Sequence, residues 1–208
     1  MATDCEINDG LLQPECLQGQ AGIKTVFFFR HTNLDVVYNV DGEITSIGSG
    51  YLYRFDQDNN HGSALEELQQ GQGEESSFIK QQIDMTMFYI DPEFRKVIDL
   101  IRKGRWAVFC LDYHDKIKLY GEMNAMKQVG GAIPSGTKSG DNLYSNLVFE
   151  GIQDEYAHFL EDFTTYPFDN MAGVEVMPRY DNAPGLILQN VGLDNILIDN
   201  FGNKLDYN

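Results

Sequence analysis

The sequence predicts a mainly β protein: a β-sandwich or barrel of about seven strands with one packed α-helix and a C-terminal extension. Two observations carry this prediction. Short runs rich in aromatic and β-branched residues are separated by polar turns, and only one segment has both the period and the ends of a helix. We expect an N-terminal arm at residues 1–21, the β domain at 22–160, and an extension or assembly arm at 161–208.

The first third of the chain indicates strands joined by turns. Residues 22–30 (GIKTVFFFR) gather β-branched and aromatic side chains, and the Asp-Gly pair at 41–42 is a strong hairpin signal. Residues 48–55 alternate aromatic with smaller or charged side chains, as a half-buried strand does. Residues 57–73 are polar and glycine-rich without a sustained period, so we expect a long loop, with at most one helical turn at 64–68.

A long strand and the clearest helix follow. Residues 77–90 have the period of two of a strand with one buried face, and the apolar side holds Ile79, Ile83, Met85, Met87 and Tyr89. The helix is expected at 91–103, with Asp91 as N-cap and Pro92 at the first helical position. Its buried stripe is Phe94, Val97, Ile98 and Ile101, and Arg102, Lys103 and Gly104 suit its C-terminal end.

The second half adds a hairpin, a loop and a strand. Two apolar runs at 105–111 and 116–121 flank a short polar loop, which predicts a hairpin. Residues 130–140 are rich in Gly, Ser and Pro and predict a loop, and 143–150 (LYSNLVFE) predicts a strand. Beyond residue 159 the chain contains prolines and then an aliphatic stretch at 186–198, which indicates an extension or a small appended hairpin.

Charge and composition restrict the classes of function. The chain has 15 basic and 32 acidic residues and a net charge of −17, which disfavours sequence-specific nucleic-acid binding because phosphates are repelled. No apolar run approaches the roughly 20 residues of a membrane span, and the acidic N-terminus does not resemble a secretory signal. We therefore expect that the chain is made in a cytoplasm and does not insert into a membrane. Three cysteines without CxxC spacing predict neither a disulfide framework nor a zinc site.

One segment approaches a phosphate-binding loop. Residues 131–139 (GAIPSGTKS) differ from G-x-x-x-x-G-K-[ST] because Thr137 separates Lys138 from the second glycine. The lysine and the backbone amides then no longer converge on one phosphate at a helix start. We expect an ordinary loop and no nucleotide.

A second segment approaches a calcium-binding loop. Asp56, Asp58, Asn60 and Glu67 fall at positions 1, 3, 5 and 12 of an EF-hand loop. Position 6, where a glycine permits the sharp turn, is His61, and no amphipathic helices flank the segment. We expect a solvated polar loop and no metal.

The sequence offers no recognisable catalytic group. His31, His61, His114 and His158 belong to no HxH, HExxH or Cys/His pattern, and no serine lies in a G-x-S-x-G motif. Cys110 lies inside an apolar strand, where a thiol is normally inert. We therefore predict that the chain is not an enzyme and has no catalytic residues, no cofactor and no metal.

The order of the elements resembles that of tail-tube-like and neck ring structural proteins of tailed bacteriophages. Four segments carry the similarity to proteins of crAss-like phages of Bacteroidales: residues 22–30, 77–91, 94–122 (FRKVIDLIRKGRWAVFCLDYHDKIKLYGE) and 136–151 (GTKSGDNLYSNLVFEG). In those proteins a helix that ends in basic residues precedes a strand hairpin, and a glycine-rich loop introduces a late strand.

The resemblance implies a tail-tube-like β-sandwich subunit of the virion, in the tail or neck. Copies would form a homo-oligomeric ring, a hexamer or dodecamer, around a channel through which double-stranded DNA passes without specific contacts. Neighbouring tail or neck proteins would be further partners. The alternative is an extracellular β-sandwich module, an adhesin or a carbohydrate-binding protein, for which a secretion signal would be expected.

We expect two places to contact other subunits. The first is the polar loop at 57–73, through Asp58 and Asn60. The second is the aliphatic C-terminal stretch, which must be covered from water, through Leu186, Leu188, Val191, Leu193, Ile196 and Ile198. The alternative for this stretch is an ordinary hairpin packed on its own core.

Overall fold

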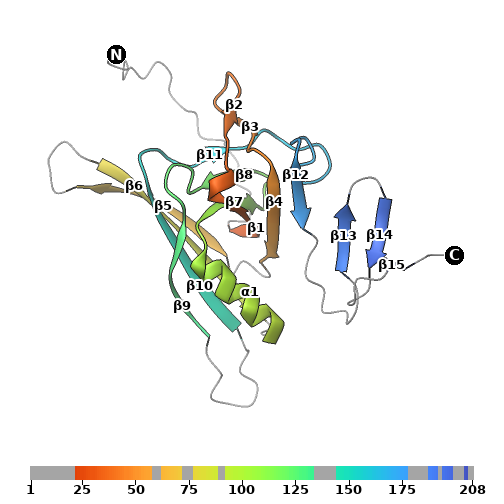
Figure 1. Ribbon diagram of the computed structural model, residues 1–208. Helices are drawn as coiled ribbons and strands as arrows, with labels where there is room; N and C mark the ends of the chain where they lie inside the picture. The colour runs from red at the N-terminus through yellow and green to blue at the C-terminus, as the bar shows by residue number, and fades with distance from the viewer. Residues whose placement is uncertain are drawn as a thin grey trace.

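The structure confirms the predicted fold class: a mainly β protein in which sheets pack together with one α-helix (Figure 1). The computed structural model describes residues 22–57, 62–71, 77–88, 92–133 and 144–177. Beyond these it describes only the backbone of three short strands at 187–191, 194–198 and 204–205.

Most strands belong to two sheets. The six-stranded sheet has the order β11 (His158–Phe159), β8 (Ile117–Tyr120), β7 (Trp106–Asp112), β1 (Ile23–Arg30), β4 (Gly50–Asp56) and β12 (Val174–Met177). The four-stranded sheet has the order β5 (Ser63–Gln70), β6 (Ser77–Phe88), β10 (Tyr144–Gln153) and β9 (Lys127–Ala132). The remaining elements are η1 (His31–Asn33), the pair β2 (Val37–Tyr38) and β3 (Ile44–Ser46), the helix α1 (Pro92–Lys103), and the sheet of β13 (Ile187–Val191), β14 (Asp194–Ile198) and β15 (Lys204–Leu205).

The centre of the six-stranded sheet is buried on both faces. Strand β1 lies between β4 and β7 and pairs antiparallel with each. Its consecutive Phe27, Phe28 and Phe29 are all buried, although successive side chains of a strand point to opposite faces. A continuous apolar run in place of an alternating one is what two-sided burial requires.

The two sheets face each other across a shared core. Phe28 and Val108 of the six-stranded sheet belong to one cluster with Ile83 and Phe149 of the four-stranded sheet. Helix α1 contributes Ile98 and Ile101 to the same cluster, two of the positions that the sequence predicted for its buried stripe. The arrangement is a sandwich with the helix packed at one end of it (Figure 1).

The opposite face of the six-stranded sheet carries a second core. Phe27, Phe109 and Leu119 pack there with residues from outside that sheet, chiefly Ile44, Ile47, Leu160, Phe168 and Met171. The Phe168 ring stacks edge-on against Phe27 and Phe109, with centroids 5.1 and 5.3 Å away. The body of the protein therefore has three layers: connecting segments, the six-stranded sheet and the four-stranded sheet.

Two of the predicted loops contain strands. The expected loop at 57–73 includes β5, which pairs with β6 along its whole length, and the expected loop at 130–140 begins inside β9. Strand β5 (SALEELQQ) has helix-forming composition and lacks a clean apolar alternation, so its strand state depends on the ladder that β6 provides. The structure also has more strands than the predicted seven, because it includes several strands that are only two to four residues long.

The main sheet continues past residue 160. Strand β12 pairs parallel with β4, and the buried Phe168 and Met171 lie in the segment that leads to it. Residues 161–177 are thus part of the folded body. The other expected strands, the hairpin around 41–42 and the helix lie where the sequence predicted them, within a few residues.

Replacing Phe28 with Ala tests how far the fold depends on the doubly buried strand. Phe28 is fully buried and stacks against Phe55, Trp106 and Phe149, so we expect a loss of about 3–5 kcal/mol in the free energy of unfolding. Urea unfolding followed by circular dichroism measures it. The control Phe159→Ala, at a ring that is 42% exposed, should change the stability much less; equal losses would contradict this account of the core.

Candidate functional site

Strands β5 and β9 are the edges of the four-stranded sheet. Gly62, just before β5, bridges Ile23 of β1, and Met126, just before β9, bridges Trp106 of β7, so each edge is tied to the other sheet at its start. In the part of the chain that the structure describes, β5 pairs only with β6, and β9 pairs only with β10. The edges also carry exposed apolar side chains: Leu65 is 55% exposed, Leu68 60% and Val129 57%. An unpaired edge offers its backbone N–H and C=O groups to another strand, and natural monomers usually shield such edges. These edges are the strongest candidates for contact with another chain.

The outer face of this sheet carries charged side chains beside apolar ones such as Leu65 and Ile152. The register places Glu67, Lys80, Asp84, Lys127 and Glu150 on the face opposite the core. Lys80 Nζ lies 2.7 Å from a carboxylate oxygen of Glu150, and both side chains are 29% exposed. Three carboxylates and two ammonium groups leave this face weakly acidic.

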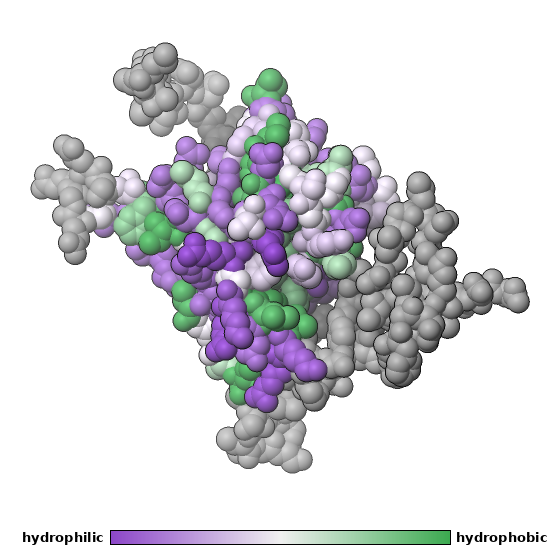
Figure 2. All heavy atoms as spheres, viewed as in Figure 1, coloured by the Kyte–Doolittle hydropathy of each residue, from purple (hydrophilic) through white to green (hydrophobic). Residues whose placement is uncertain are grey.

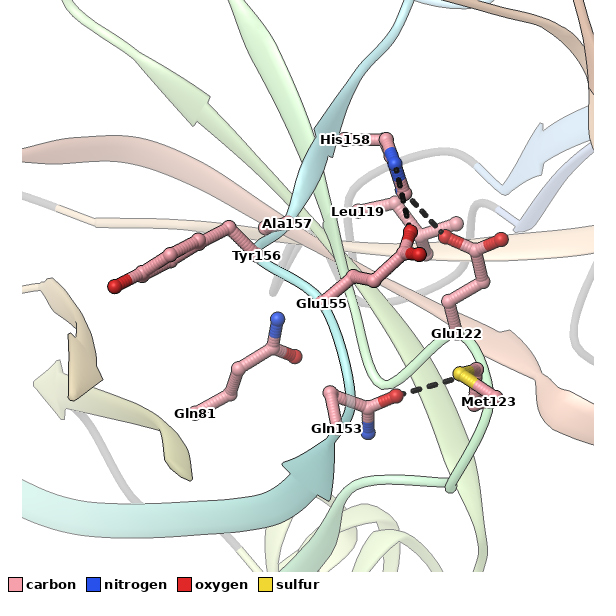
Figure 3. A pocket seen from close by; sticks show the side chains of 9 residues that line it. All are labelled: Gln81, Leu119, Glu122, Met123, Gln153, Glu155, Tyr156, Ala157 and His158. Carbon is pink, nitrogen blue, oxygen red and sulfur yellow. Dashed lines mark hydrogen bonds and ion pairs between the residues drawn. The ribbon is translucent and has the colours of Figure 1, made fainter. Parts of the chain in front are cut away.

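A small pocket lies beside β11, where the loop after β8 meets the end of β10 (Figure 3). Its volume is about 100 Å³, well below the roughly 300–1,000 Å³ of sites that enclose a drug-sized ligand. Its walls are Gln81, Leu119, Glu122, Met123, Gln153, Glu155, Tyr156, Ala157 and His158. The pocket is too small to enclose a substrate of that size.

A histidine between two carboxylates forms the polar wall of the pocket. His158 Nδ1 lies 3.0 Å from Glu122 and its Nε2 lies 3.5 Å from Glu155 (Figure 3). The hydroxyl of Tyr38 donates to Glu122 and lies 3.3 Å from His158 Nδ1. Burial, and then the hydrogen bond and the charge of Glu122, raise the pKa of Tyr38 well above its usual value. Tyr38 therefore remains a protonated donor and ties the β2–β3 hairpin to the body.

Two buried glutamines hold the loop after β8, which lines the pocket. The side-chain oxygen of Gln153 accepts from the backbone N–H groups of Met123 and Asn124, at 2.9 and 3.2 Å, and its amide donates to Asn124 O at 2.6 Å. Gln81 accepts from the N–H of Gly121 at 2.9 Å. Both glutamines are 2% exposed. They satisfy backbone groups of a loop that has no ladder of its own.

The sequence prediction did not single out these glutamines. The signal that could have found Gln81 is its parity, because position 81 falls between Ile79 and Ile83 on the apolar side of β6. A polar side chain on a buried face needs a partner. Nothing comparable marks Glu122 and His158, which come together only through the pairing of β8 with β11.

Cys110, His31 and His114 do not line the pocket. Burial raises the pKa of the Cys110 thiol far above its usual value, so it is not a nucleophile near neutral pH. Among the residues that the structure describes, no three His, Cys, Asp or Glu side chains are placed to hold a metal ion. His31 Nε2 lies 2.8 Å from the carbonyl oxygen of Glu122, and His114 is exposed on the β7–β8 turn.

The predicted interface residues are only partly within the described chain. Asp58, Asn60, Leu186 and Leu193 lie outside it. Positions 188 and 191 are on β13, and positions 196 and 198 are on β14, which pair as an antiparallel hairpin. The register, with 187 opposite 198 and 189 opposite 196, places positions 191, 196 and 198 on one face of this hairpin and 188 on the other.

The two motif-like segments are also only partly described. Gly131 of the phosphate-loop-like segment lies in β9, and residues 134–139 lie outside the described chain. Asp56 of the calcium-loop-like segment ends β4, where it accepts from Thr25 Oγ1 at 2.9 Å and from Arg54 Nε at 2.8 Å. Glu67 lies on β5 opposite Lys80.

Replacing Gln153 with Leu tests the role of the buried amide. Two N–H groups lose their acceptor, so we expect the free energy of unfolding to fall by about 2–3 kcal/mol in urea titrations. The control is Gln70→Leu, at an exposed position of β5, which should change it by less than about 0.5 kcal/mol. Similar effects of the two substitutions would show that Gln153 does not hold the loop.

No protein-family model matches the chain, and no curated protein matches its sequence. Within the described part of the chain, no helix has the length and apolar character needed to cross a membrane. A function must therefore be inferred from the surfaces that the structure describes, above all from the edges of the four-stranded sheet.

Proposed function

We propose that this chain is a structural subunit of a phage virion, in a neck or tail ring or a tail tube, that oligomerises around a DNA-conducting channel. The observation that supports this most is the four-stranded sheet with free edges at β5 and β9. The element order, with one helix before a strand hairpin, is the order on which the resemblance to tail-tube-like proteins rests. The role is assembly, and we propose no catalytic activity.

The directions of the strands suit a ring. Each neighbouring pair in the order β5, β6, β10, β9 is antiparallel, so β9 runs opposite to β5. Copies related by rotation about an axis parallel to the strands keep these directions. Strand β9 of one copy then meets β5 of the next as an antiparallel pair, and the alternation continues across the seam. A closed ring of this kind leaves no edge of the four-stranded sheet exposed.

The same geometry selects the face toward the channel. One face of the four-stranded sheet is covered by the six-stranded sheet and α1, which occupy more space and belong on the larger outer circumference. The other face, with Glu67, Lys80, Asp84, Lys127 and Glu150, is free to line the channel. A weakly acidic lining repels phosphates, and DNA can pass without binding.

The seam can be tested with one charge on each edge. We expect Leu65→Lys and Val129→Lys, alone or together, to abolish rings in negative-stain images, because a charged edge opposes strand pairing. The folded state, followed by circular dichroism, should be unchanged since both side chains are more than half exposed.

The matched control for the seam is Ile152→Lys. Ile152 is 53% exposed on the same sheet but lies on the central strand β10, so rings should persist. Discrete monomers of the unmodified protein in images and in sedimentation velocity would refute the proposed function. Normal rings of the Leu65 and Val129 variants would refute the β5–β9 seam.

We also propose that the C-terminal segment is an assembly arm. Residues up to Met177 belong to the folded body, so the informative truncation is after Met177. The shortened protein should keep its circular dichroism spectrum and melting temperature but lose ring or stack formation. If the truncated protein unfolds, the aliphatic stretch at 186–198 covers its own core; if it assembles normally, the segment is not an arm.

A further inference from the structure

The surface around α1 is basic in an otherwise acidic protein. Six of the 15 Lys and Arg residues of the sequence lie on α1 or beside it, all of them exposed: Arg30, Arg95, Lys96, Arg102, Lys103 and Arg105. Arg30 belongs to this group because it lies opposite Trp106 in the β1–β7 ladder. The only ion pair that a described acid makes with them joins Arg102 to Asp99 at 3.4 Å, with both side chains more than half exposed.

Cations elsewhere are mostly neutralised by neighbours. Lys24, Arg54, Lys80, Lys116 and Lys118 each have a carboxylate partner within 4 Å. We call the six cations on α1 and beside it the basic face of α1. Among the described cations outside it, only Lys127 has no carboxylate partner.

The basic face also contains an exposed apolar side chain. Leu100 lies four residues after Lys96 and three before Lys103 on α1, and is 68% exposed. Figure 2 shows hydrophilic and apolar surface side by side over α1.

A complementary surface lies at the opposite end of the molecule. The β2–β3 hairpin projects away from the body at the end farthest from α1 (Figure 1). Val40 at its tip is fully exposed and Val37 is 50% exposed. Asp41 at the tip and Asp35 at the base of the hairpin, where its N–H donates to Ile47 O, are exposed carboxylates. The hairpin thus combines apolar and negative groups, whereas the basic face of α1 combines one apolar group with several positive groups.

The hairpin is held in one conformation. Its turn is closed by Asn39, whose side-chain oxygen accepts from the N–H groups of Asp41 and Glu43 at 2.9 Å each. Tyr38 ties the hairpin to Glu122 and stacks edge-on against His158, with centroids 5.1 Å apart. A preorganised projection loses little entropy on docking.

We propose that the β2–β3 hairpin of one copy docks on the basic face of α1 of a second copy, with Val40 against Leu100 and Asp35 and Asp41 against the cations. The two surfaces lie at opposite ends of the described body (Figure 1), so the contact is heterologous and open, and it joins copies end to end. It rests on the proposed function in that it would stack rings, but it uses other residues than the β5–β9 seam.

Charge explains why such a contact is needed. Subunits of net charge −17 repel one another, and stacking requires a local attraction that offsets this repulsion. Binding of DNA phosphates is the competing role of the basic face. We favour the hairpin because the exposed Leu100 matches an apolar tip, which a phosphate backbone does not offer.

A charge exchange tests the contact in the full-length protein. Lys96→Glu with Lys103→Glu, and separately Asp35→Lys with Asp41→Lys, should each weaken end-to-end association in sedimentation velocity about tenfold or more. Combining all four substitutions in one chain should restore it to within about threefold, because each contact again joins opposite charges. Rings in negative-stain images should persist throughout, which separates this contact from the seam.

The matched control adds the same charge elsewhere. Lys24→Glu with Lys116→Glu also makes the net charge more negative by four, but away from α1, and should leave stacking within about twofold. If the Lys96 and Lys103 variant fails to fold by circular dichroism, Arg95→Glu with Arg102→Glu tests the same face.

Four results would overturn the docking. The first is an absence of end-to-end association in the unmodified protein, and the second is a loss that combining all four substitutions does not rescue. The third is an equal loss in the Lys24 and Lys116 control. The fourth is duplex-DNA binding, measured by fluorescence anisotropy, that the Lys96 and Lys103 variant abolishes while its association is unchanged. The last of these would assign the basic face to phosphates. Rescue by the four-fold exchange supports the hairpin contact.

Discussion

Two-sided burial of strand β1 is the constraint on which the rest of the structure depends. Its partners β4 and β7 fix the six-stranded sheet, and its alternating side chains enter two different cores. Each core then needs a cover: the four-stranded sheet with α1 on one side, and the segments around Ile44 and Phe168 on the other. Because the outer layers are held by this strand, the hairpin and the free edges are fixed in position on the surface.

The sequence predicts elements well where local chemistry and tertiary contacts agree. The phenylalanine run of β1, the alternation of β6 and the ends of α1 are unambiguous in this sense. Strand β5 escapes prediction because SALEELQQ has no strand pattern of its own and becomes a strand by pairing with β6. The loop anchored by Gln153 is likewise invisible, since Met123 and Asn124 lie 29 or more residues away from it.

The lengths of the edge strands of the two sheets bear on the proposed role. The six-stranded sheet ends in β11 and β12, two and four residues long, whereas the four-stranded sheet ends in β5 and β9, eight and six residues long. Short edges resist pairing with other chains and long ones favour it. Among the described residues, the four-stranded sheet is therefore the one whose edges suit the proposed ring.

A ring and a stack demand opposite properties of their contacts. A ring seam must close on itself, so it needs a fixed angle, and the proposed backbone ladder between β5 and β9 would supply one. A stacking contact must repeat without closing, and it must also act against the repulsion between strongly acidic subunits. In the proposed stack, the basic face of α1 and the negative, apolar-tipped hairpin of the next copy would meet that second requirement. Under this proposal the gathering of six cations on α1 and beside it would serve open assembly, because evenly spread cations would offset the negative charge equally well but could not direct one end of a subunit to the other.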